Sequence, residues 1–418
     1  MKLKLSTSYR ETRISGLMIV GSILSGGFLV LDESGEGLIA KVKNNEEFDE
    51  AALSDNLKEM VEAGKEIGIF LDYDEEEVIE DTIGQVYSAY VHVTDHCNLH
   101  CKGCYSAINE RNAKPELSTE DLKKVLRKLR EAGCAKLLVS GGEPFMRKDI
   151  VEILKYAKEE LEYENIIMAT NGTVYDRDLV AEASKYLDVL SVSIDGFCPN
   201  DCDYIRDKGA FAKADAFIDM AKSVGANIRL LPTLHRYNYK KIPEYEKYAE
   251  EKEISLGFSL LTCNKDDLEL SEYVLSPEEM IELTAGAKDE TLAAIEDTSF
   301  DLESLYFNNS CGAGHGFISV SSDGNVYPCH MLQDERYKLG NILKEELRDI
   351  LSCKTAEDFR AINVDTNTKC KECKYAYFCG GGCKARQLFQ DNKTVDMYCE
   401  SYKYNYKKLD AAIAALAE

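Results

Sequence analysis

Seven of the fifteen cysteines in this 418-residue chain stand in two tightly spaced groups. The first is a C-x3-C-x2-C group and the second a C-x2-C-x5-C-x3-C group, made respectively by Cys97, Cys101 and Cys104 and by Cys370, Cys373, Cys379 and Cys383. An odd cysteine total and this bunching argue against a disulfide framework and favour metal ligation in a reducing compartment. The chain is therefore expected to fold around metal sites, and we expect it in the cytoplasm.

The charge balance excludes one broad class of function. Asp and Glu number 75 against 50 Lys and Arg, which gives a net charge of −25. A nucleic-acid-binding protein is therefore not expected. Residues 14–31 carry no charge and resemble a membrane anchor, but they contain many glycines and serines. We predict a hairpin there, with strands over 17–24 and 28–31, and no association with a membrane.

Residues 1–84 read as a small first module. Besides the hairpin, the pattern predicts a strand over 2–5, another over 38–42 and helices over 46–62. The module ends in an acidic run, most simply a solvated linker, that consists of Asp72, Asp74, Glu75, Glu76, Glu77, Glu80 and Asp81. This run places the first domain boundary.

From residue 85 apolar runs alternate with amphipathic helices, and the alternation stops near residue 262. The expected strands cover 86–93, 136–140, 166–170, 189–194, 228–233 and 255–260. Six such units predict an α/β fold, a partial (β/α)6 TIM-like barrel whose parallel sheet is buried on both faces and whose chemistry lies at the strands' carboxyl ends. Residues 263–310 are expected to be a linker with bridging helices, one of which starts at Ser276-Pro277. Residues 311–418 form a Cys-rich segment that needs metal ligands to fold.

The first cysteine group directly follows the first barrel strand. Its three thiolates would leave one metal position of an iron–sulfur cluster open, and no fourth ligand stands at zinc-finger spacing. Here the chain resembles the radical S-adenosylmethionine (SAM) enzymes. The resemblance continues in Gly141-Gly142-Glu143-Pro144 after the second strand, where Glu143 would accept the SAM ammonium. It extends to later strand ends, at Asn171, Ser193, Asp195 and Arg206, the last being similar to the family arginine that meets the SAM carboxylate.

This resemblance implies a mechanism and a cofactor set. Cys97, Cys101 and Cys104 would hold a 4Fe–4S cluster that binds SAM, and a 5′-deoxyadenosyl radical would abstract hydrogen from the substrate. An electron donor such as flavodoxin or ferredoxin would supply the electron. The protein's own task would be to position the reactants and exclude water.

The C-terminal cysteines resemble the seven-cysteine pattern of the SPASM domain, which binds auxiliary iron–sulfur clusters. The resemblance implies two further 4Fe–4S clusters, three in all, held by Cys370, Cys373, Cys379 and Cys399 and by Cys311, Cys329 and Cys383. The second set lacks a fourth ligand, which could be Cys263, Cys353 or none. Zinc ribbons would need closed sets of four ligands.

A histidine follows Cys329 where sulfatase-maturing members of the family have an aspartate. His330 is thus a candidate proton acceptor or a donor to cluster sulfur, with a surface imidazole as the simpler alternative. The pattern is closer to maturases that cross-link ribosomally made peptides, so we expect a precursor peptide of leader and core as the substrate and a thioether as the product. Residues 1–84 would then be a winged-helix-like module that adds the leader as an extra strand. Side-chain oxidation, carbon–carbon bond formation and a non-catalytic iron–sulfur scaffold are the alternatives.

Overall fold

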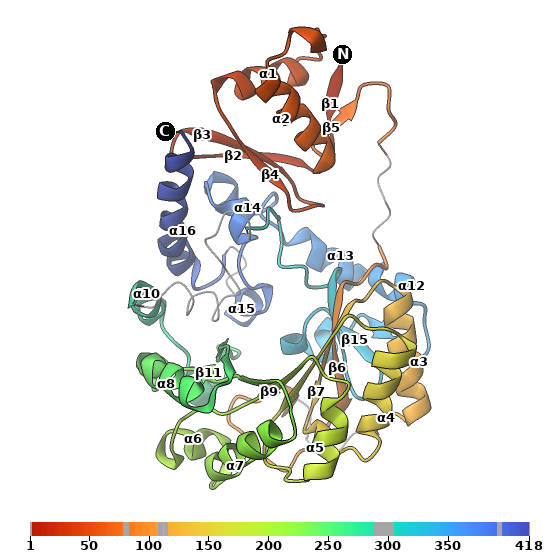
Figure 1. Cartoon of the computed structure of the whole chain (residues 1–418), viewed down its shortest axis with the longest axis vertical. Coiled ribbons are helices and arrows are strands. Elements are labelled where there is room, and N and C mark those ends of the chain that lie inside the picture. The colour runs from red at the N-terminus through yellow and green to blue at the C-terminus, as the bar shows by residue number, and fades with distance from the viewer. Residues whose placement is uncertain are drawn as a thin grey trace.

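The computed structural model describes residues 2–77, 83–107, 112, 116–286, 305–390 and 395–417. The molecule is elongated, with the N-terminal strands and helices at one end, the large sheet and its helices at the other, and the last part of the chain, in dark blue, between them (Figure 1). Part of the acidic run, at residues 78–82, and much of the expected bridging segment, at residues 287–304, lie outside the described residues.

The N-terminal module is built from short antiparallel strands and two helices. β2 (Tyr9–Ile14), β3 (Leu17–Ser22) and β4 (Phe28–Leu31) form a three-stranded sheet, so the hairpin expected over residues 17–31 is confirmed. A second pair joins β1 (Leu3–Leu5) to β5 (Phe70–Asp72). The helices α1 (Glu33–Lys43) and α2 (Asp55–Glu66) complete the module.

The strand expected over residues 38–42 is wrong, because this stretch belongs to α1. Asp32 caps the helix by accepting the N–H of Gly35 at 2.8 Å. Leu38, Ile39 and Val42 then fall on one helical face and are buried. An i, i+1, i+4 spacing fits a helix, whereas a run of only five residues does not separate helix from strand.

The two faces of the three-stranded sheet pack against different parts of the chain. Val20 and Leu31 face α1 and α2 in the module's own core. Ile14 and Ile19 point to the other side, into an apolar cluster with residues of the C-terminal segment, namely Phe307, Tyr375, Phe378, Tyr406, Leu409 and Ile413. Since side chains alternate between the faces of a strand, residues 19 and 20 serve two cores.

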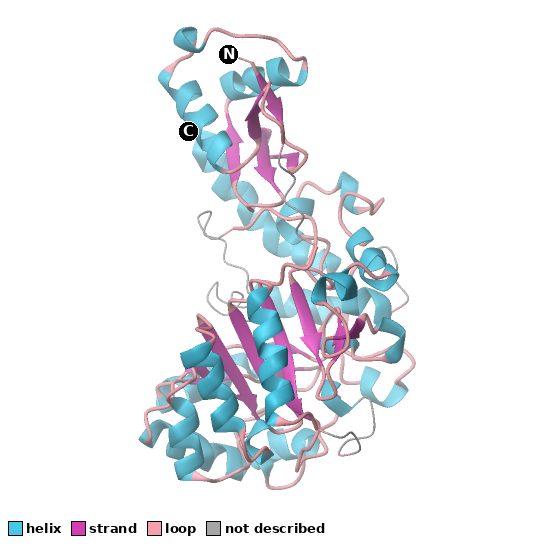
Figure 2. Cartoon of the chain, turned by 90° about the vertical axis from the view of Figure 1, so that its right-hand side faces the viewer, coloured by secondary structure: helices cyan, strands magenta, loops and turns pink. Residues whose placement is uncertain are grey.

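The large sheet confirms the α/β fold and the partial barrel. Its parallel strands are β6 (Ser88–Thr94), β7 (Lys136–Gly141), β8 (Asn165–Thr170), β9 (Val189–Val192), β10 (Ile228–Leu230) and β12 (Ser255–Leu256). A separate parallel pair, β11 (Thr233–Leu234) and β13 (Ser259–Leu260), follows the last two strands. The intervening helices cover one face of the sheet (Figure 2), and they are α3 (Thr119–Glu131), α4 (Ile150–Lys155), α5 (Arg177–Ser184), α7 (Ala210–Ser223) and α8 (Ile242–Lys252).

The opposite face of this sheet is not an apolar core, which corrects the expectation that both faces are buried alike. Outward residues such as Val91, Val139 and Leu190 pack against the helices. Polar or small residues on the opposite face of this sheet line a cavity, among them Tyr90, Ser140, Ala169 and Arg229. A closed barrel fills this space with branched apolar side chains, whereas this open one leaves room for ligands.

The C-terminal segment extends the same sheet. β14 (Phe317–Val320) pairs in parallel with β6, and β15 (Asn325–Tyr327) and β16 (Gly340–Asn341) continue antiparallel beyond it. The remaining helices are α6 (Pro199–Arg206), α9 (Leu268–Ser271), α10 (Pro277–Gly286), α12 (Leu347–Leu351), α13 (Lys354–Ala361), α14 (Ala376–Cys379), α15 (Lys384–Phe389) and α16 (Cys399–Ala414). Ser276 caps α10 as expected, since its hydroxyl accepts the Glu279 N–H at 3.1 Å. Within the described ranges no helix is long and apolar enough to cross a membrane.

Candidate active site

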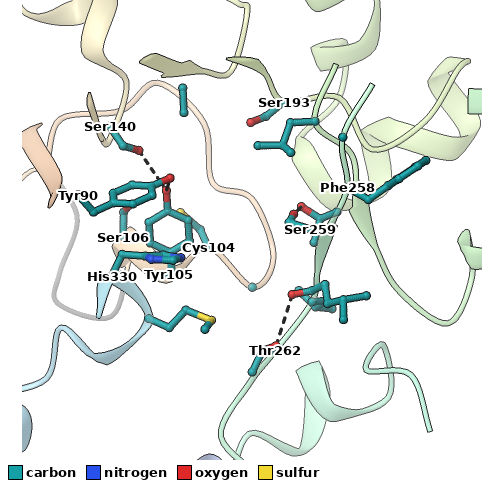
Figure 3. Close-up of a pocket in the computed structure, with 18 of the residues that line it drawn as sticks. Tyr90, Cys104, Tyr105, Ser106, Ser140, Ser193, Phe258, Ser259, Thr262 and His330 are labelled. Atoms are coloured by element: carbon teal, nitrogen blue, oxygen red, sulfur yellow. Dashed lines mark hydrogen bonds between the residues drawn. The ribbon is translucent and has the colours of Figure 1, made fainter. Parts of the chain in front are cut away.

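One cavity of about 1040 Å³ connects the two cysteine-rich parts of the chain. Cys97, Cys101 and Cys104 line it from the barrel, and Cys311, Cys329, Cys379 and Cys383 line it from the C-terminal segment. Figure 3 shows Tyr90, Tyr105 and His330 on one side of it, with Ser193 and Ser259 on the opposite side. The fold thus brings residues more than 200 positions apart to one chamber.

The loop of the first cysteine group is anchored on α6. The Lys102 N–H donates to the carbonyl of Ile205 at 2.8 Å, and the His100 N–H donates to the Asp207 carboxylate at 2.6 Å. Burial raises the pKa of Cys101 to about 11, nearby Arg206 lowers it, and Cys104 and Cys97 raise it. The three thiols therefore lie close enough together to influence one another's charge.

Gly141 and Gly142 are required by the close approach of two backbone segments. A Cβ on Gly141 would lie 2.1 Å from the carbonyl oxygen of Thr94, and one on Gly142 would lie 2.1 Å from that of His96. The Gly142 N–H donates to Thr94 and the Glu143 N–H to His96, at 2.8 and 2.7 Å. The glycine motif is thus bonded to the loop that carries the first cysteine group, and Gly141 and Gly142 also line the cavity.

Glu143 lies behind this wall rather than in the cavity. It has no solvent exposure, and its carboxylate accepts the Phe145 N–H at 3.1 Å, the Thr170 hydroxyl at 2.8 Å and the Asn171 N–H at 2.7 Å. Burial raises its pKa to about 7, although these three donors lower it. The contacts make Glu143 a brace between the ends of β7 and β8. Pro144 is also buried and opens a short 3-10 turn outside the cavity lining.

Asn171, Ser193, Asp195 and Arg206 all line the cavity, as their places at strand ends lead one to expect. The Asn171 amide donates to Asn98 at 2.9 Å and lies 3.7 Å from the Cys97 sulfur. Arg206 forms an ion pair with Asp195 through Nε at 2.5 Å. Burial alone would lower the pKa of Arg206, but Asp195 raises it. Among the described residues no hydrogen bond engages the terminal guanidinium nitrogens, so they can receive a carboxylate.

The C-terminal thiols fall into two neighbourhoods. Burial raises the pKa of Cys329, and Cys383 and Cys311 raise it further. Burial likewise raises the pKa of Cys379, with additions from Cys399, Cys370 and Cys373. The seven cysteines therefore fall into two sets by the thiols that act on one another's pKa. One set is Cys311, Cys329 and Cys383, and the other is Cys370, Cys373, Cys379 and Cys399.

The other two cysteines considered for the set of three are occupied differently. Cys353 is the N-cap of α13, where its sulfur accepts the Ala356 N–H at 3.4 Å. Burial raises the pKa of Cys263 to about 11, and the further contribution comes from Asp267 rather than from a thiol. Neither is among the thiols that raise the pKa of Cys329 most, which are Cys383 and Cys311.

His330 belongs to an aromatic group that the sequence analysis did not foresee. Its ring stacks on Tyr90 with centroids 4.4 Å apart and meets the edge of Tyr105 at 5.1 Å. The two tyrosine hydroxyls lie 3.2 Å apart, and Tyr105 also lies 3.0 Å from the Ser140 hydroxyl. Burial lowers the pKa of His330 to about 4. The signal that could have revealed Tyr90 is the polar alternation on the inner face of the first strand.

The residues at both ends of the cavity fit iron–sulfur clusters and SAM. In the described part of the chain no three His, Cys, Asp or Glu side chains converge on the position of one metal ion. A cluster spaces its thiolates more widely, because each of them binds a different iron. Three thiols with a glycine-rich wall and a guanidinium offer ligands for such a cluster and for an amino acid carboxylate. When bound, SAM and its cluster supply the radical that removes hydrogen from a substrate.

Comparisons with known proteins agree with this chemistry. A family model described as the radical SAM superfamily matches residues 91–249, and one described as an iron–sulfur cluster-binding domain, SPASM, matches residues 311–374. The first match includes the first cysteine group, the glycine motif and Arg206. The second begins at Cys311 and includes Cys329, Cys370 and Cys373.

Curated relatives are similar at low identity. The chain is 26% identical over 336 residues to the Fe-coproporphyrin III synthase of Methanosarcina barkeri, covering 70% of this chain and 82% of that protein. It is 26% identical over 314 residues to the mycofactocin maturase MftC of Mycolicibacterium smegmatis, covering 71% and 78%. The crystal structure of Streptococcus suis SuiB bound to S-adenosylmethionine shares the fold, with a TM-score of 0.61 at 19% identity over 94% of this chain and 98% of that one.

The partial barrel, the motifs at its strand ends and the Cys-rich extension together define a SAM-dependent iron–sulfur enzyme. The chain belongs to the radical SAM superfamily and carries a SPASM domain. Its radical SAM domain binds SAM and a 4Fe–4S cluster, and its SPASM domain binds auxiliary iron–sulfur clusters.

Proposed function

We propose that this enzyme acts on a ribosomally made precursor peptide in the cytoplasm and installs a cross-link in its core. The observation that carries the proposal is the single cavity lined by both cysteine-rich parts of the chain. A peptide segment lying in it can meet the SAM end and the auxiliary end at once. Two relatives named for such chemistry support it, since MftC is a maturase and SuiB has been solved with its precursor peptide SuiA.

The domain and residue assignments follow from the same proposal. Residues 1–84 recognise the leader, residues 85–262 form the barrel, 263–310 link it and 311–418 hold the auxiliary clusters. Cys97, Cys101 and Cys104 hold the SAM cluster. Gly141, Gly142, Asn171, Ser193 and Arg206 contact SAM, whereas Glu143 and Asp195 orient these residues through the hydrogen bonds described above.

The leader role of the N-terminal module has structural support. Residues 1–84 make up a fifth of the chain, so a SuiB match that covers 94% must include most of them. Strand β4 pairs with β3 on one side, and no other described strand pairs with its outer edge. An open edge of this kind can accept an extended peptide as a further strand. β2 is the other edge strand of this sheet, but its Arg10 and Thr12 bond to Asp365 and Lys374 of the C-terminal segment, so we assign the leader to β4.

A thioether is the cross-link that we favour. We take Cys311, Cys329 and Cys383 as a set of three. Cys353 caps α13, and Asp267 rather than a thiol adds to the pKa of Cys263, so we propose neither as the fourth ligand. A cysteine of the peptide is then the candidate for the fourth ligand. His330 lies next to Cys329, with its Nδ1 3.7 Å from the sulfur, where a neutral imidazole can accept a proton from the substrate. An external donor such as flavodoxin or ferredoxin supplies electrons.

The test uses, as the candidate precursor, the peptide encoded by a short Cys-rich reading frame next to the gene of this enzyme. Anaerobically reconstituted enzyme, SAM and a reductant should remove two hydrogen atoms per cross-link, seen by mass spectrometry, and protect the joined cysteine from alkylation. The same core without its leader should react far more slowly. The variant with Cys97, Cys101 and Cys104 all replaced by Ala is the control. If the wild-type enzyme cleaves SAM rapidly and leaves every leader-bearing peptide unchanged in mass, a peptide is not the substrate.

A further inference from the structure

Apart from the cysteines proposed to bind clusters, the charged side chains that line the cavity are mostly basic, whereas the molecule as a whole is acidic. The chain carries a net charge of −25, yet the described residues that line the cavity include five basic side chains and one acidic one. The basic ones are Lys102, Lys136, Arg206, Arg229 and Arg386, and the acidic one is Asp195. These side chains offer more positions for an anion than for a cation.

Three of these cations already have protein partners. Lys102 is held by Glu269 at 3.4 Å, Arg206 by Asp195 at 2.5 Å, and Arg386 by the buried Asp396 at 2.9 Å. Lys136 starts β7 and is exposed. Arg229 differs from all four, because it is partly buried and its guanidinium makes no hydrogen bond or ion pair with any described residue.

The position of Arg229 is fixed by the sheet. Its neighbours on β10, Ile228 and Leu230, pack into the core under the helices, so Arg229 points to the cavity side. In register it lies beside Ser191 of β9 and Ser255 of β12. Ser193, at the level of the SAM motifs, lies just past the end of β9 and two residues beyond Ser191, which is about 7 Å. Arg229 therefore stands deeper in the barrel than the proposed SAM contacts.

We propose that Arg229 binds a carboxylate of the substrate and so fixes which part of the peptide lies beneath SAM. An arginine fork matches a carboxylate with two parallel hydrogen bonds, and a partly buried guanidinium without a partner gains most from such a ligand. The proposal rests on the peptide substrate proposed above. The carboxylate is either an Asp or Glu side chain or the free C-terminus of the peptide.

The first experiment measures the site without a peptide. Equilibrium dialysis of radiolabelled glutarate against the reconstituted, SAM-loaded enzyme should show binding that weakens about tenfold to a hundredfold in Arg229→Gln. Arg229→Lys should fall between the two. Arg236→Gln is the matched control, because Arg236 pairs with Glu279 outside the cavity lining. Equal glutarate affinity in wild type and Arg229→Gln, stronger binding of inorganic phosphate than of glutarate, or an equal loss of SAM affinity would each overturn the assignment.

The second experiment identifies the carboxylate. Random seven-residue peptides with amidated or free C-termini are retained on the loaded enzyme and read by mass spectrometry. Enrichment of Asp and Glu in the amidated pool indicates a side chain, and preference for free C-termini whatever the sequence indicates the terminus. Either preference should vanish in Arg229→Gln, and a preference that persists there refutes the proposal. If glutarate binding depends on Arg229 but no peptide is retained, the carboxylate site stands and the peptide substrate fails.

Discussion

Replacing Glu143 by Gln tests whether this residue touches SAM or braces the wall that does. The carboxylate accepts hydrogen bonds from Phe145, Thr170 and Asn171, two of them backbone N–H groups on opposite oxygens. An amide has one oxygen, so in either orientation its NH₂ group faces one of these N–H donors. At least one buried N–H thus loses its acceptor.

The cost can be worked from these contacts. A buried hydrogen bond to a charged group contributes about 1.5–3 kcal/mol, and leaving its donor unsatisfied costs a similar amount. If the Asn171 segment moves to recover that energy, SAM should bind about tenfold to a hundredfold more weakly. The loss comes from the displaced wall and not from a missing contact with the ligand.

The assay compares SAM with its analogue that lacks the amino group, by equilibrium dialysis on reconstituted enzyme. A bracing role predicts that Glu143→Gln weakens both ligands by the same factor. A direct contact with the ammonium predicts a loss for SAM alone, with the deaminated analogue unaffected. The bracing interpretation is refuted by that selective loss, or by a variant that binds SAM as tightly as the wild type.

Four further outcomes are expected. Burial raises the pKa of Glu143 to about 7, so the contribution of this residue to the free energy of unfolding is fully present below pH 4.5. As the pH rises to about 7 this contribution declines, by at most about 3 kcal/mol. The melting temperature of the wild type should therefore fall relative to that of Glu143→Gln between pH 5 and 7. The triple Ala variant of Cys97, Cys101 and Cys104 should lose SAM cleavage but keep the iron of the C-terminal segment, and retained cleavage would contradict the assigned ligands. Cys263→Ala and Cys353→Ala should each leave iron content nearly unchanged, whereas a loss of about four irons would identify a missing ligand. Phe307→Ala removes a fully buried ring that stacks on Tyr377 at 5.0 Å, which should cost about 3–5 kcal/mol and speed proteolytic release of the N-terminal module; unchanged proteolysis would mean that the shared core does not hold the module.

Local patterns were enough to predict the barrel. Strands β7, β8, β9 and β10 each lie in an apolar run between two helices, and caps such as Ser118 mark where helices begin. The stretch over 38–42 failed because its apolar spacing suits either structure, and only the Asp32 cap and the packing of Leu38 and Ile39 decide it. Local patterns also could not separate a cavity-lining face from a buried one.

Contacts between distant residues were not predictable. Nothing in Gly141-Gly142-Glu143-Pro144 says that Glu143 turns toward Thr170 and Asn171 instead of the ligand. The capping role of Cys353 depends on where α13 begins. The Arg229 guanidinium lacks a partner because no described residue on the neighbouring strands pairs with it. A sequence pattern does not show which side chains of different strands meet.

The attachment of the N-terminal module changes how its proposed leader role should be tested. Because Ile14 and Ile19 share a core with Tyr375 and Phe378, deleting residues 1–84 would expose an apolar face beside Cys373 and Cys379. Substitutions on the outer edge of β4 or in the leader itself are therefore the better perturbation.

The pairing of β14 with β6 bears on the kind of product that this enzyme can release. Four consecutive register pairs, from Phe317 with Ser88 to Val320 with Val91, join the barrel to the C-terminal segment by a backbone ladder. A ladder resists the rotation that a hinge between two domains would allow, so the SAM end and the set of three cysteines stand at a fixed separation. In the cross-linking reaction proposed above, the protein then imposes the spacing between the two peptide residues that are joined. We expect rings of one size, set by how many residues span the chamber.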